Sequence, residues 1–267
     1  MKKYLVIGNP IDHSQSPKLH NYWIKENNLN AVYEKKKIAE NELKNLILEI
    51  KEKKINGANV TVPFKNKVIP FLDKLSTRAE ITQSVNTIYR ESEKIIGDNT
   101  DIDGFELSLN NQNHNVAEKK VLILGGGGVV PSIIFALNKM RVSKIYLTNR
   151  TRSKAENLKI LFKNLIVLDW GEIPDVDIVI NATSVGLNKS EKIDFDFAKL
   201  GKNKFFYDVI YNPKQTEFLK KGKELGFQVQ NGEMMFIYQA ASAFKIWHSI
   251  YPKIDEQLID LLNKWLE

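Results

Sequence analysis

The chain has 267 residues, of which 39 are Lys or Arg and 32 are Asp or Glu, so its formal net charge is +7. Hydrophobic residues make up 43% and charged residues 27%, a globular composition that excludes a disordered or fibrous chain. The absence of Cys excludes disulfides, a thiolate nucleophile and Cys-ligated metal sites.

We expect neither a metal centre nor a membrane segment. None of the four histidines belongs to an HExxH arrangement. The first apolar run stops at Gly8-Asn9-Pro10, too early for a signal peptide, and the uncharged stretch 121–137 contains four glycines and a proline. We therefore expect a cytoplasmic protein. The excess positive charge comes mostly from scattered Lys, which favours solvated helix faces over a nucleic-acid surface.

Strand and helix patterns alternate along the chain, which indicates parallel α/β architecture. Ser16 is the expected N-cap of the first helix, with Pro17 at its first position. The first part is predicted to contain strands at 4–8, 31–38 and 57–62, helices at 17–28 and 40–54, and a hairpin of 87–89 with 94–97. The second part is predicted to contain a strand at 121–124, a helix ending near Lys139, and strands at 144–148, 165–168, 177–181, 205–209 and 228–230.

A strand, a glycine turn, a helix and a second strand form the mononucleotide-binding half of a dinucleotide-binding fold. We therefore predict two domains. An N-terminal α/β domain over 1–100 would bind the substrate and carry the catalytic groups, and a Rossmann-like domain over 101–236 would bind the cofactor. Helices at 238–249 and 254–266 are expected to pack on the first domain, which would then include 237–267.

The glycine turn is the first functional signal. Gly125 and Gly127 fit the first two positions of a GxGxxG pattern, and Val130 occupies the third. Without a Cβ, the backbone can turn sharply and bring N–H groups to a pyrophosphate at the helix N-terminus. The sequence therefore predicts a dinucleotide site, with a flexible connector as the alternative.

The end of the next strand indicates which dinucleotide binds. An NAD site has Asp or Glu there, but the segment from Thr148 to Lys154 contains no acid, and the first acid is Glu156. A guanidinium can instead bind a 2′-phosphate through two charge-assisted hydrogen bonds. We predict NADP(H), with Arg150 as the main contact and Arg152 or Lys154 assisting; solvated loop charges are the alternative.

Short segments rich in small polar residues stand at predicted strand ends in the first part. Hydroxyls and amides at the carboxyl ends of strands suit a small polyhydroxylated or carboxylated ligand. Each segment alone could also be turn chemistry. The segments are 8–17, 59–65, 84–87 and 97–104.

Together these segments resemble the shikimate dehydrogenase family, in order over nearly the whole chain. The resemblance runs through Gly-x-Pro-x-x-His-Ser-x-Ser-Pro, Asn-Val-Thr-x-Pro-x-Lys, Val-Asn-Thr and Asn-Thr-Asp, and then through the glycine loop, Asn-Arg-Thr, Asn-Ala-Thr-Ser and Tyr-Asn-Pro. It implies a two-domain α/β reductase, usually a homodimer. Such an enzyme converts 3-dehydroshikimate to shikimate with NADPH, on the route to chorismate and aromatic amino acids.

The resemblance also implies roles for individual residues. Lys65 would be the catalytic acid/base, coupled to Asp101, and Ser14 with Ser16 would meet the substrate carboxylate. The other substrate-binding residues would be Asn59, Thr61, Asn86, Asp101, Tyr211 and Gln239. The cofactor would contact Gly125, Gly126, Gly127, Gly128, Val129, Asn149, Arg150, Thr151, Arg152, Ser153, Lys154, Val209 and Gly232. Thr77 stands where many relatives carry an acid, so its contact with the cofactor is left open.

The chemistry agrees with the Lys65–Asp101 pair. Hydride added to a ketone leaves an alkoxide, which needs a proton donor within hydrogen-bond reach. A carboxylate beside an ammonium group favours the charged, donating form. The pair therefore fits proton donation in the reduction direction.

Three alternatives stay open. The enzyme could also accept quinate or prefer NAD, although the two serines and Arg150 favour shikimate and NADP. A non-catalytic NADP-binding regulator would be favoured by loss of Lys65 or Asp101, and both are present. An RNA-binding protein would need a salt-sensitive basic surface.

Overall fold

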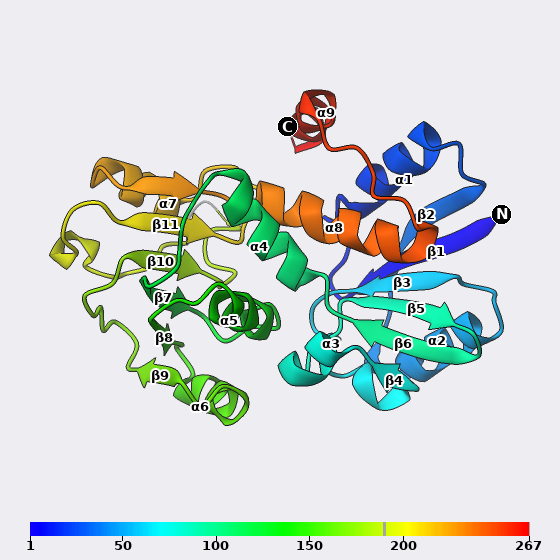
Figure 1. Cartoon of the computed structure of the whole chain (residues 1–267), viewed down its shortest axis with the longest axis horizontal. Helices are drawn as coiled ribbons and strands as arrows, with labels where there is room; N and C mark the ends of the chain where they lie inside the picture. Colours follow the sequence, from blue (N-terminus) through cyan, green and yellow to red (C-terminus); the bar gives the residue numbers. More distant parts are fainter. Residues whose placement is uncertain (189–190, 267) are drawn as a thin grey trace. The chain divides into compact units, whose positions relative to one another are not determined.

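The computed structural model describes residues 1–188 and 191–266, and the chain divides into two compact units (Figure 1). The first unit is Met1–Gly104 together with Ile237–Glu267, and the second is Phe105–Phe236. The chain passes between the units within α4 (Asp101–Asn111) and within α8 (Glu233–His248). A division after residue 100, as expected from the sequence, would place Asp101 in the second part, whereas Asp101 belongs to the first unit.

The first unit contains a six-stranded sheet in the order β2-β1-β3-β5-β6-β4. Strands β1, β2 and β3 are parallel, but β5 runs antiparallel to β3 and, across the expected hairpin, to β6. The sheet is therefore mixed rather than parallel throughout. Its strands are β1 (Lys2–Gly8), β2 (Ala31–Lys37), β3 (Gly57–Val60), β4 (Lys74–Leu75), β5 (Thr87–Glu91) and β6 (Lys94–Asp98).

Helices cover both faces of this sheet (Figure 1). On one face, Leu43, Leu46 and Ile50 recur at helical spacing along α2 (Leu43–Lys51) and pack on Leu5, Ile7 and Ala58. Ala79 of α3 (Thr77–Thr82) joins the same core. Short 3₁₀ turns at Glu40–Glu42 and Ile69–Phe71 complete this face.

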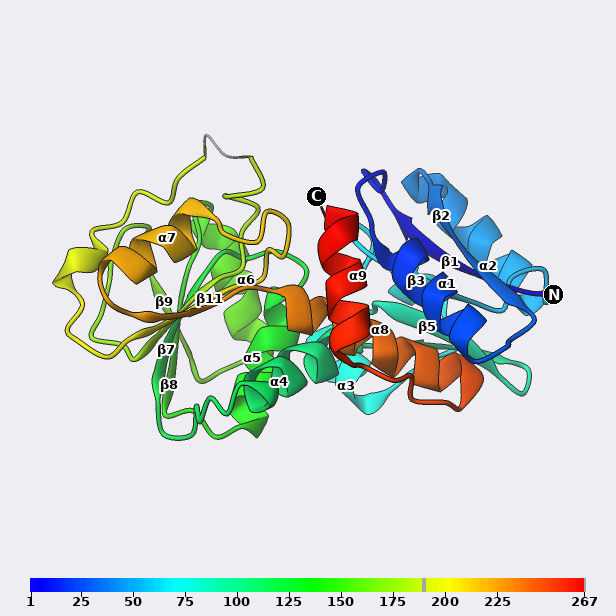
Figure 2. The same ribbon diagram turned by 90° about the horizontal axis from the view of Figure 1, so that it is seen from above.

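Aromatic side chains fill the opposite face, between the sheet, α1 (Ser16–Glu26) and α8. Tyr4 of β1 packs on Trp247 of α8, with ring centroids 4.9 Å apart. The Trp247 indole N–H donates to the Ile88 carbonyl at 3.1 Å, and Trp23 of α1 donates to the Lys253 carbonyl at 3.2 Å. These bonds tie the C-terminal segment, which ends in α9 (Glu256–Leu266), to the first unit (Figure 2).

The second unit contains a fully parallel sheet in the order β9-β8-β7-β10-β11-β12. This is the 3-2-1-4-5-6 order of doubly wound dinucleotide-binding domains, with the order reversing between β7 and β10. The strands are β7 (Lys120–Leu124), β8 (Lys144–Thr148), β9 (Leu165–Leu168), β10 (Ile178–Asn181), β11 (Phe205–Asp208) and β12 (Gln228–Gln230). The helices that follow them are α5 (Val130–Lys139), α6 (Arg152–Leu161) and α7 (Glu217–Glu224), with a 3₁₀ turn at Phe197–Lys199.

Alternating residues of β11 show how this sheet is covered. The Phe206 ring stacks on that of Phe218 of α7, with ring centroids 4.7 Å apart, whereas the Tyr207 ring packs edge-on against Phe105 of α4, with centroids 5.1 Å apart. Successive strand residues point to opposite faces, so α7 and the second half of α4 cover opposite faces. Among the described residues, no helix is long and apolar enough to cross a membrane.

Candidate active site

The Lys65 ammonium and the Asp101 carboxylate form a buried ion pair in the first unit. Nζ and Oδ2 are 2.5 Å apart, and only 12% and 8% of the two side chains are exposed. Breaking such a pair on one side leaves an uncompensated buried charge, which costs about 3–5 kcal/mol. The structure therefore holds a cation and an anion at one place, as the sequence predicts.

Backbone hydrogen bonds bring the loops that carry this pair together. The Val85 N–H donates to the Lys65 carbonyl at 2.8 Å, which fastens the loop after β3 to the segment before β5. The Asn99 side chain accepts from the Asp101 N–H at 3.2 Å and donates to the Ser84 carbonyl at 3.0 Å. Asn99 thus holds the start of α4 against the same segment.

Asn86 binds the carboxylate oxygen of Asp101 that does not face Lys65. Its Nδ2 donates to Asp101 Oδ1 at 2.9 Å and to Thr100 Oγ1 at 3.0 Å. Its Oδ1 accepts from the Thr100 N–H at 2.7 Å. Because a backbone N–H cannot become an acceptor, this last bond fixes which end of the Asn86 amide faces Asp101.

A cluster of Arg78 with two carboxylates near the start of α4 went unnoticed in the sequence. Arg78 Nε and Nη2 donate to the two carboxylate oxygens of Asp98 at 2.7 and 2.9 Å, and Arg78 Nη1 donates to Asp103 at 2.6 Å. Burial raises the pKa of Asp98, but the hydrogen bonds and the charge of Arg78, together with hydrogen bonds from Ser76 and the Asn99 N–H, outweigh it and lower that pKa below its usual value. Arg78 thereby ties α3 to the end of β6 and to the first turn of α4.

The two serines differ from the expected arrangement in one respect. Helix α1 begins at Ser16, with Gln15 as its N-cap and no capping side chain, so Ser16 as N-cap is wrong. The Ser16 N–H instead donates to Ser14 Oγ at 3.3 Å, which places both serines at the helix N-terminus. A carboxylate is stabilised at such a position by the helix dipole and the free N–H groups.

The remaining predicted substrate residues lie at different places. Thr61 follows β3, and its N–H donates to the Ile7 carbonyl at 2.9 Å, so it stands beside the end of β1. Gln239 is half-buried on α8 of the first unit. Tyr211 lies in the second unit, where its ring stacks on Phe236 with centroids 4.5 Å apart. Asn59 is buried, and its amide bonds Tyr33, Thr87 and the Asn86 carbonyl.

In the second unit, the glycine turn connects β7 to α5 at the point where the strand order reverses. Gly125 has φ +113°, and a Cβ there would lie 2.9 Å from the Ala182 carbonyl oxygen. Any side chain at this position would therefore be strained and would collide with the loop after β10. The turn leaves the N-terminus of α5 open to a phosphate group, so a dinucleotide fits here.

The expected 2′-phosphate residues follow β8 beside this turn. A Cβ on Gly126 would lie 3.2 Å from the Asn149 side chain and 3.3 Å from that of Lys154, so the two loops touch. Arg150 is exposed and forms no ion pair with any residue in the described ranges. Arg152, in contrast, pairs with Asp169 and with Glu156, so its guanidinium is already engaged.

Val209 and Gly232 meet at the other side of the reversal point. The Gly232 N–H donates to the Ile210 carbonyl at 3.0 Å, and a Cβ on Gly232 would lie 2.1 Å from the Val209 carbonyl oxygen. The two segments can approach this closely only with glycine at 232.

A buried carboxylate, Asp208, holds the loops after β10 and β11 together. It accepts hydrogen bonds from Asn181 Nδ2 at 3.1 Å, from the Ile210 N–H at 3.0 Å and from Thr216 Oγ1 at 2.6 Å. Sequence reasoning missed it, because its partners lie 8 and 27 residues away. No cation compensates it among these bonds, and burial raises its pKa to about 6.

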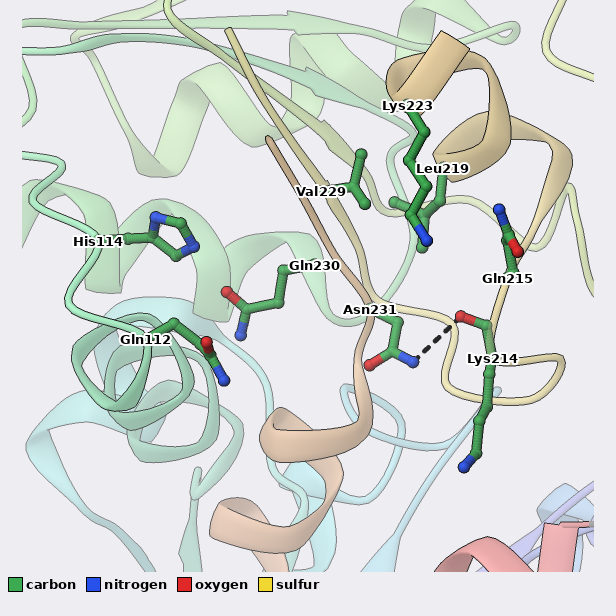
Figure 3. Close-up of a pocket in the computed structure, with 9 residues that line it drawn as sticks. All are labelled: Gln112, His114, Lys214, Gln215, Leu219, Lys223, Val229, Gln230 and Asn231. Carbon is green, nitrogen blue, oxygen red and sulfur yellow. Dashed lines mark hydrogen bonds between the residues drawn. The ribbon is translucent and has the colours of Figure 1, made fainter. Parts of the chain in front are cut away.

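A polar hollow of about 290 Å³ lies along the edge strand β12 (Figure 3). Asn231 donates to the Lys214 carbonyl at 3.1 Å at its rim, while the Lys214 ammonium points away from it. Its lining is drawn entirely from the second unit and includes none of the residues expected to bind substrate or cofactor. Within the described ranges, no group of three or more acidic or histidine side chains could hold a metal ion.

The fold and the two sites define a class of protein, a two-unit α/β dehydrogenase. One unit carries a dinucleotide-binding turn at the reversal point of a doubly wound sheet, and the other carries a buried Lys–Asp pair. Residues 6–88 match the shikimate dehydrogenase substrate-binding domain, and residues 107–217 match the shikimate/quinate 5-dehydrogenase domain. The chain belongs to the shikimate dehydrogenase family.

Similar proteins span the whole chain. A shikimate dehydrogenase (NADP⁺) of Pelagibacter ubique is 57% identical over 262 residues, covering 98% of this chain and 99% of its own. The crystal structure of shikimate dehydrogenase from Aquifex aeolicus is 36% identical, with a TM-score of 0.87 over 98% of this chain and 97% of that one. That of shikimate 5-dehydrogenase from Thermus thermophilus, in complex with NADP(H) and shikimate, is 28% identical, with a TM-score of 0.90 over 100% of both chains.

The raised pKa of Asp208 predicts a pH-dependent stability. A carboxyl whose pKa rises from 3.8 to about 6 on folding stabilises the fold below pH 4 and loses that contribution as the pH rises through 6. The free energy of unfolding of the native chain, relative to Asp208→Asn, should fall by about 2 kcal/mol between pH 4 and pH 7. Urea titrations measure it, with the exposed Asp194→Asn as control. A pH-independent difference would show that Asp208 titrates normally.

Proposed function

We propose that this chain catalyses the reversible NADPH-dependent reduction of 3-dehydroshikimate to shikimate, in the biosynthesis of chorismate and aromatic amino acids. The observation that carries the proposal is the buried Lys65–Asp101 pair, at 2.5 Å, in a chain 57% identical to a shikimate dehydrogenase (NADP⁺). The first unit would bind the substrate and the second the cofactor.

In the proposed reaction, Lys65 donates the proton. NADPH supplies the hydride when bound. The Lys65 ammonium gives its proton to the ketone oxygen as it becomes an alkoxide, and in the reverse direction the neutral amine takes the proton back. Asp101 orients the ammonium and accepts a hydrogen bond from a ring hydroxyl. Asn86, Thr61 and Gln239 would hold the other hydroxyls, and Ser14 with Ser16 the carboxylate.

The cofactor would bind along the carboxyl ends of β7, β8 and β11. The glycine turn Gly125–Gly128 and Val129 would meet the pyrophosphate, and Asn149–Lys154 the adenosine end. Arg150 would hold the 2′-phosphate, because Arg152 already pairs with two carboxylates. Val209 and Gly232 would line the nicotinamide end, with Tyr211 near the substrate.

We further propose that the enzyme works in the cytoplasm as a homodimer, as the family resemblance implies. Light scattering tests the assembly: it should give twice the mass of one chain, and a single-chain mass would refute the dimer.

The direct test of the function is nicotinamide absorbance with shikimate or quinate, each combined with NADP or NAD. We expect the highest kcat/KM for shikimate with NADP. Higher kcat/KM with quinate or NAD would favour the enzyme of relaxed specificity. Activity in none of the four combinations would favour a non-catalytic NADP-binding regulator.

The choice of cofactor depends on Arg150. Arg150→Ala should raise the KM for NADP about ten- to a hundred-fold, because charge-assisted hydrogen bonds contribute about 1.5–3 kcal/mol. The KM for NAD should change little. Arg152→Ala serves as the comparison and should have a smaller effect on the NADP KM. Equal losses with NADP and NAD would mean that Arg150 supports the fold rather than the phosphate.

The proton donor is tested by Lys65→Met. The proton is needed only as the alkoxide forms, so we expect kcat to fall about 10²–10⁴-fold with little change in the shikimate KM. Asp101→Asn should affect both kcat and KM, because it removes a substrate contact as well as the ammonium's partner. The control is Lys67→Met, an exposed lysine on the same loop that pairs with Glu40. A raised shikimate KM with unchanged kcat would show that Lys65 only attracts the substrate.

A further inference from the structure

A buried tyrosine on the second strand is connected to the Asp101 carboxylate by an unbroken series of hydrogen bonds. Tyr33 is only 1% exposed, and its hydroxyl donates to Asn59 Oδ1 at 2.6 Å. Asn59 Nδ2 donates to Thr87 Oγ1 at 3.1 Å, and Thr87 Oγ1 donates to Asn86 Oδ1 at 2.9 Å. Asn86 then donates to Asp101 at 2.9 Å.

The tyrosine end of this series is held by α1. The Tyr33 ring stacks on His20 with centroids 4.1 Å apart and planes 1° from parallel. The Tyr33 N–H donates to Asn21 Oδ1 at 2.9 Å, and its carbonyl accepts from Asn21 Nδ2 at 2.7 Å. The helix α1 therefore fixes the position and the rotation of the tyrosine.

Both N–H groups of the Asn59 amide are engaged, and its oxygen already accepts one hydrogen bond. Its oxygen accepts from Tyr33, and its two N–H groups donate to Thr87 and to the Asn86 carbonyl at 3.0 Å. The side chain is also buried, with 7% of the residue exposed. A substrate hydroxyl could accept a hydrogen bond from Asn59 only by breaking one of the two N–H bonds, which would leave a buried polar group unsatisfied.

The direction of the bonds assigns a task to each member. Thr87 Oγ1 accepts from Asn59 and donates to Asn86 Oδ1 at 2.9 Å, the shorter of two contacts open to its proton, the other being Thr100 Oγ1 at 3.1 Å. The Thr100 N–H can only donate, so it fixes Oδ1 as the end of the Asn86 amide turned away from Asp101, and Thr87 adds a second donor to the same oxygen. We propose that Tyr33, Asn59 and Thr87 are positioning residues, which hold Asn86 in the orientation that sets Asp101 against Lys65. Asn59 on this account acts on the site through Thr87 and Asn86.

The kinetic test is Tyr33→Phe, and it rests on the proposed function. Losing one neutral hydrogen bond far from the ligand should lower kcat about three- to tenfold and leave the NADP KM within about twofold. The matched control is Tyr4→Phe, because Tyr4 is also buried and pairs in register with Tyr33 on the neighbouring strand. Equal kcat in the two variants would overturn the proposal.

Two substitutions of Thr87 distinguish the contribution of its hydroxyl from that of its packing. Thr87→Ser keeps the hydroxyl and should leave kcat within about twofold of the native enzyme, whereas Thr87→Val keeps the shape and should lower it about three- to tenfold. A loss of kcat in Thr87→Ser with Thr87→Val near the native value would mean that Thr87 contributes packing alone, which contradicts the proposal.

A readout without turnover distinguishes this proposal from the proposed function. The side-chain amide resonances of Asn86, assigned in a ¹H–¹⁵N spectrum by their loss in Asn86→Asp, should shift in Tyr33→Phe and stay in place in Tyr4→Phe. Unmoved resonances in Tyr33→Phe would overturn the positioning role. A chain that shows the shift but does not oxidise shikimate would contradict the function alone.

Discussion

The arrangement of the first unit depends on a buried ammonium–carboxylate pair. Lys65 and Asp101 are both largely withdrawn from water, and two such charges are tolerated only when their remaining hydrogen-bonding groups are satisfied. Asp101 meets this requirement through its hydrogen bond from Asn86. Asn99 and the Arg78–Asp98 bonds hold the start of α4, which carries Asp101, in place. The mixed sheet serves the same end, because the reversal at β5 carries Asn86 and Thr87 to the side of β3 that leads to Lys65.

The second unit depends on close approach between backbone segments rather than on buried charges. Its glycines allow segments to approach where side chains would collide, at Gly125 beside Ala182 and at Gly232 beside Val209. Asp208 then holds the loops after β10 and β11 together through its hydrogen bonds. On the proposed function, one unit would therefore supply fixed polar groups for proton transfer, and the other a backbone surface for the dinucleotide.

Local patterns predicted the parts of the fold that depend on contiguous residues. The run from β7 through the glycine turn to β8 is recognisable because an apolar strand, a tight turn and an amphipathic helix follow one another directly. The N-cap of the first helix was predicted one residue too late, because Gln15 occupies the N-cap position and the helix begins at Ser16. Arg78, Tyr33 and Asp208 could not be found in this way, because each acts on partners 8 to 27 residues away that only the folded chain brings near.

The central claim is that Lys65 exchanges a proton with the substrate oxygen that is oxidised or reduced. A crystal structure with shikimate and NADP tests it most directly. The reacting hydroxyl should lie about 2.6–3.2 Å from Lys65 Nζ, with Asp101 bonded to both the ammonium and a ring hydroxyl. A complex in which that hydroxyl faces another titratable group, with Lys65 beyond the reach of a hydrogen bond or a single bridging water, would contradict the account.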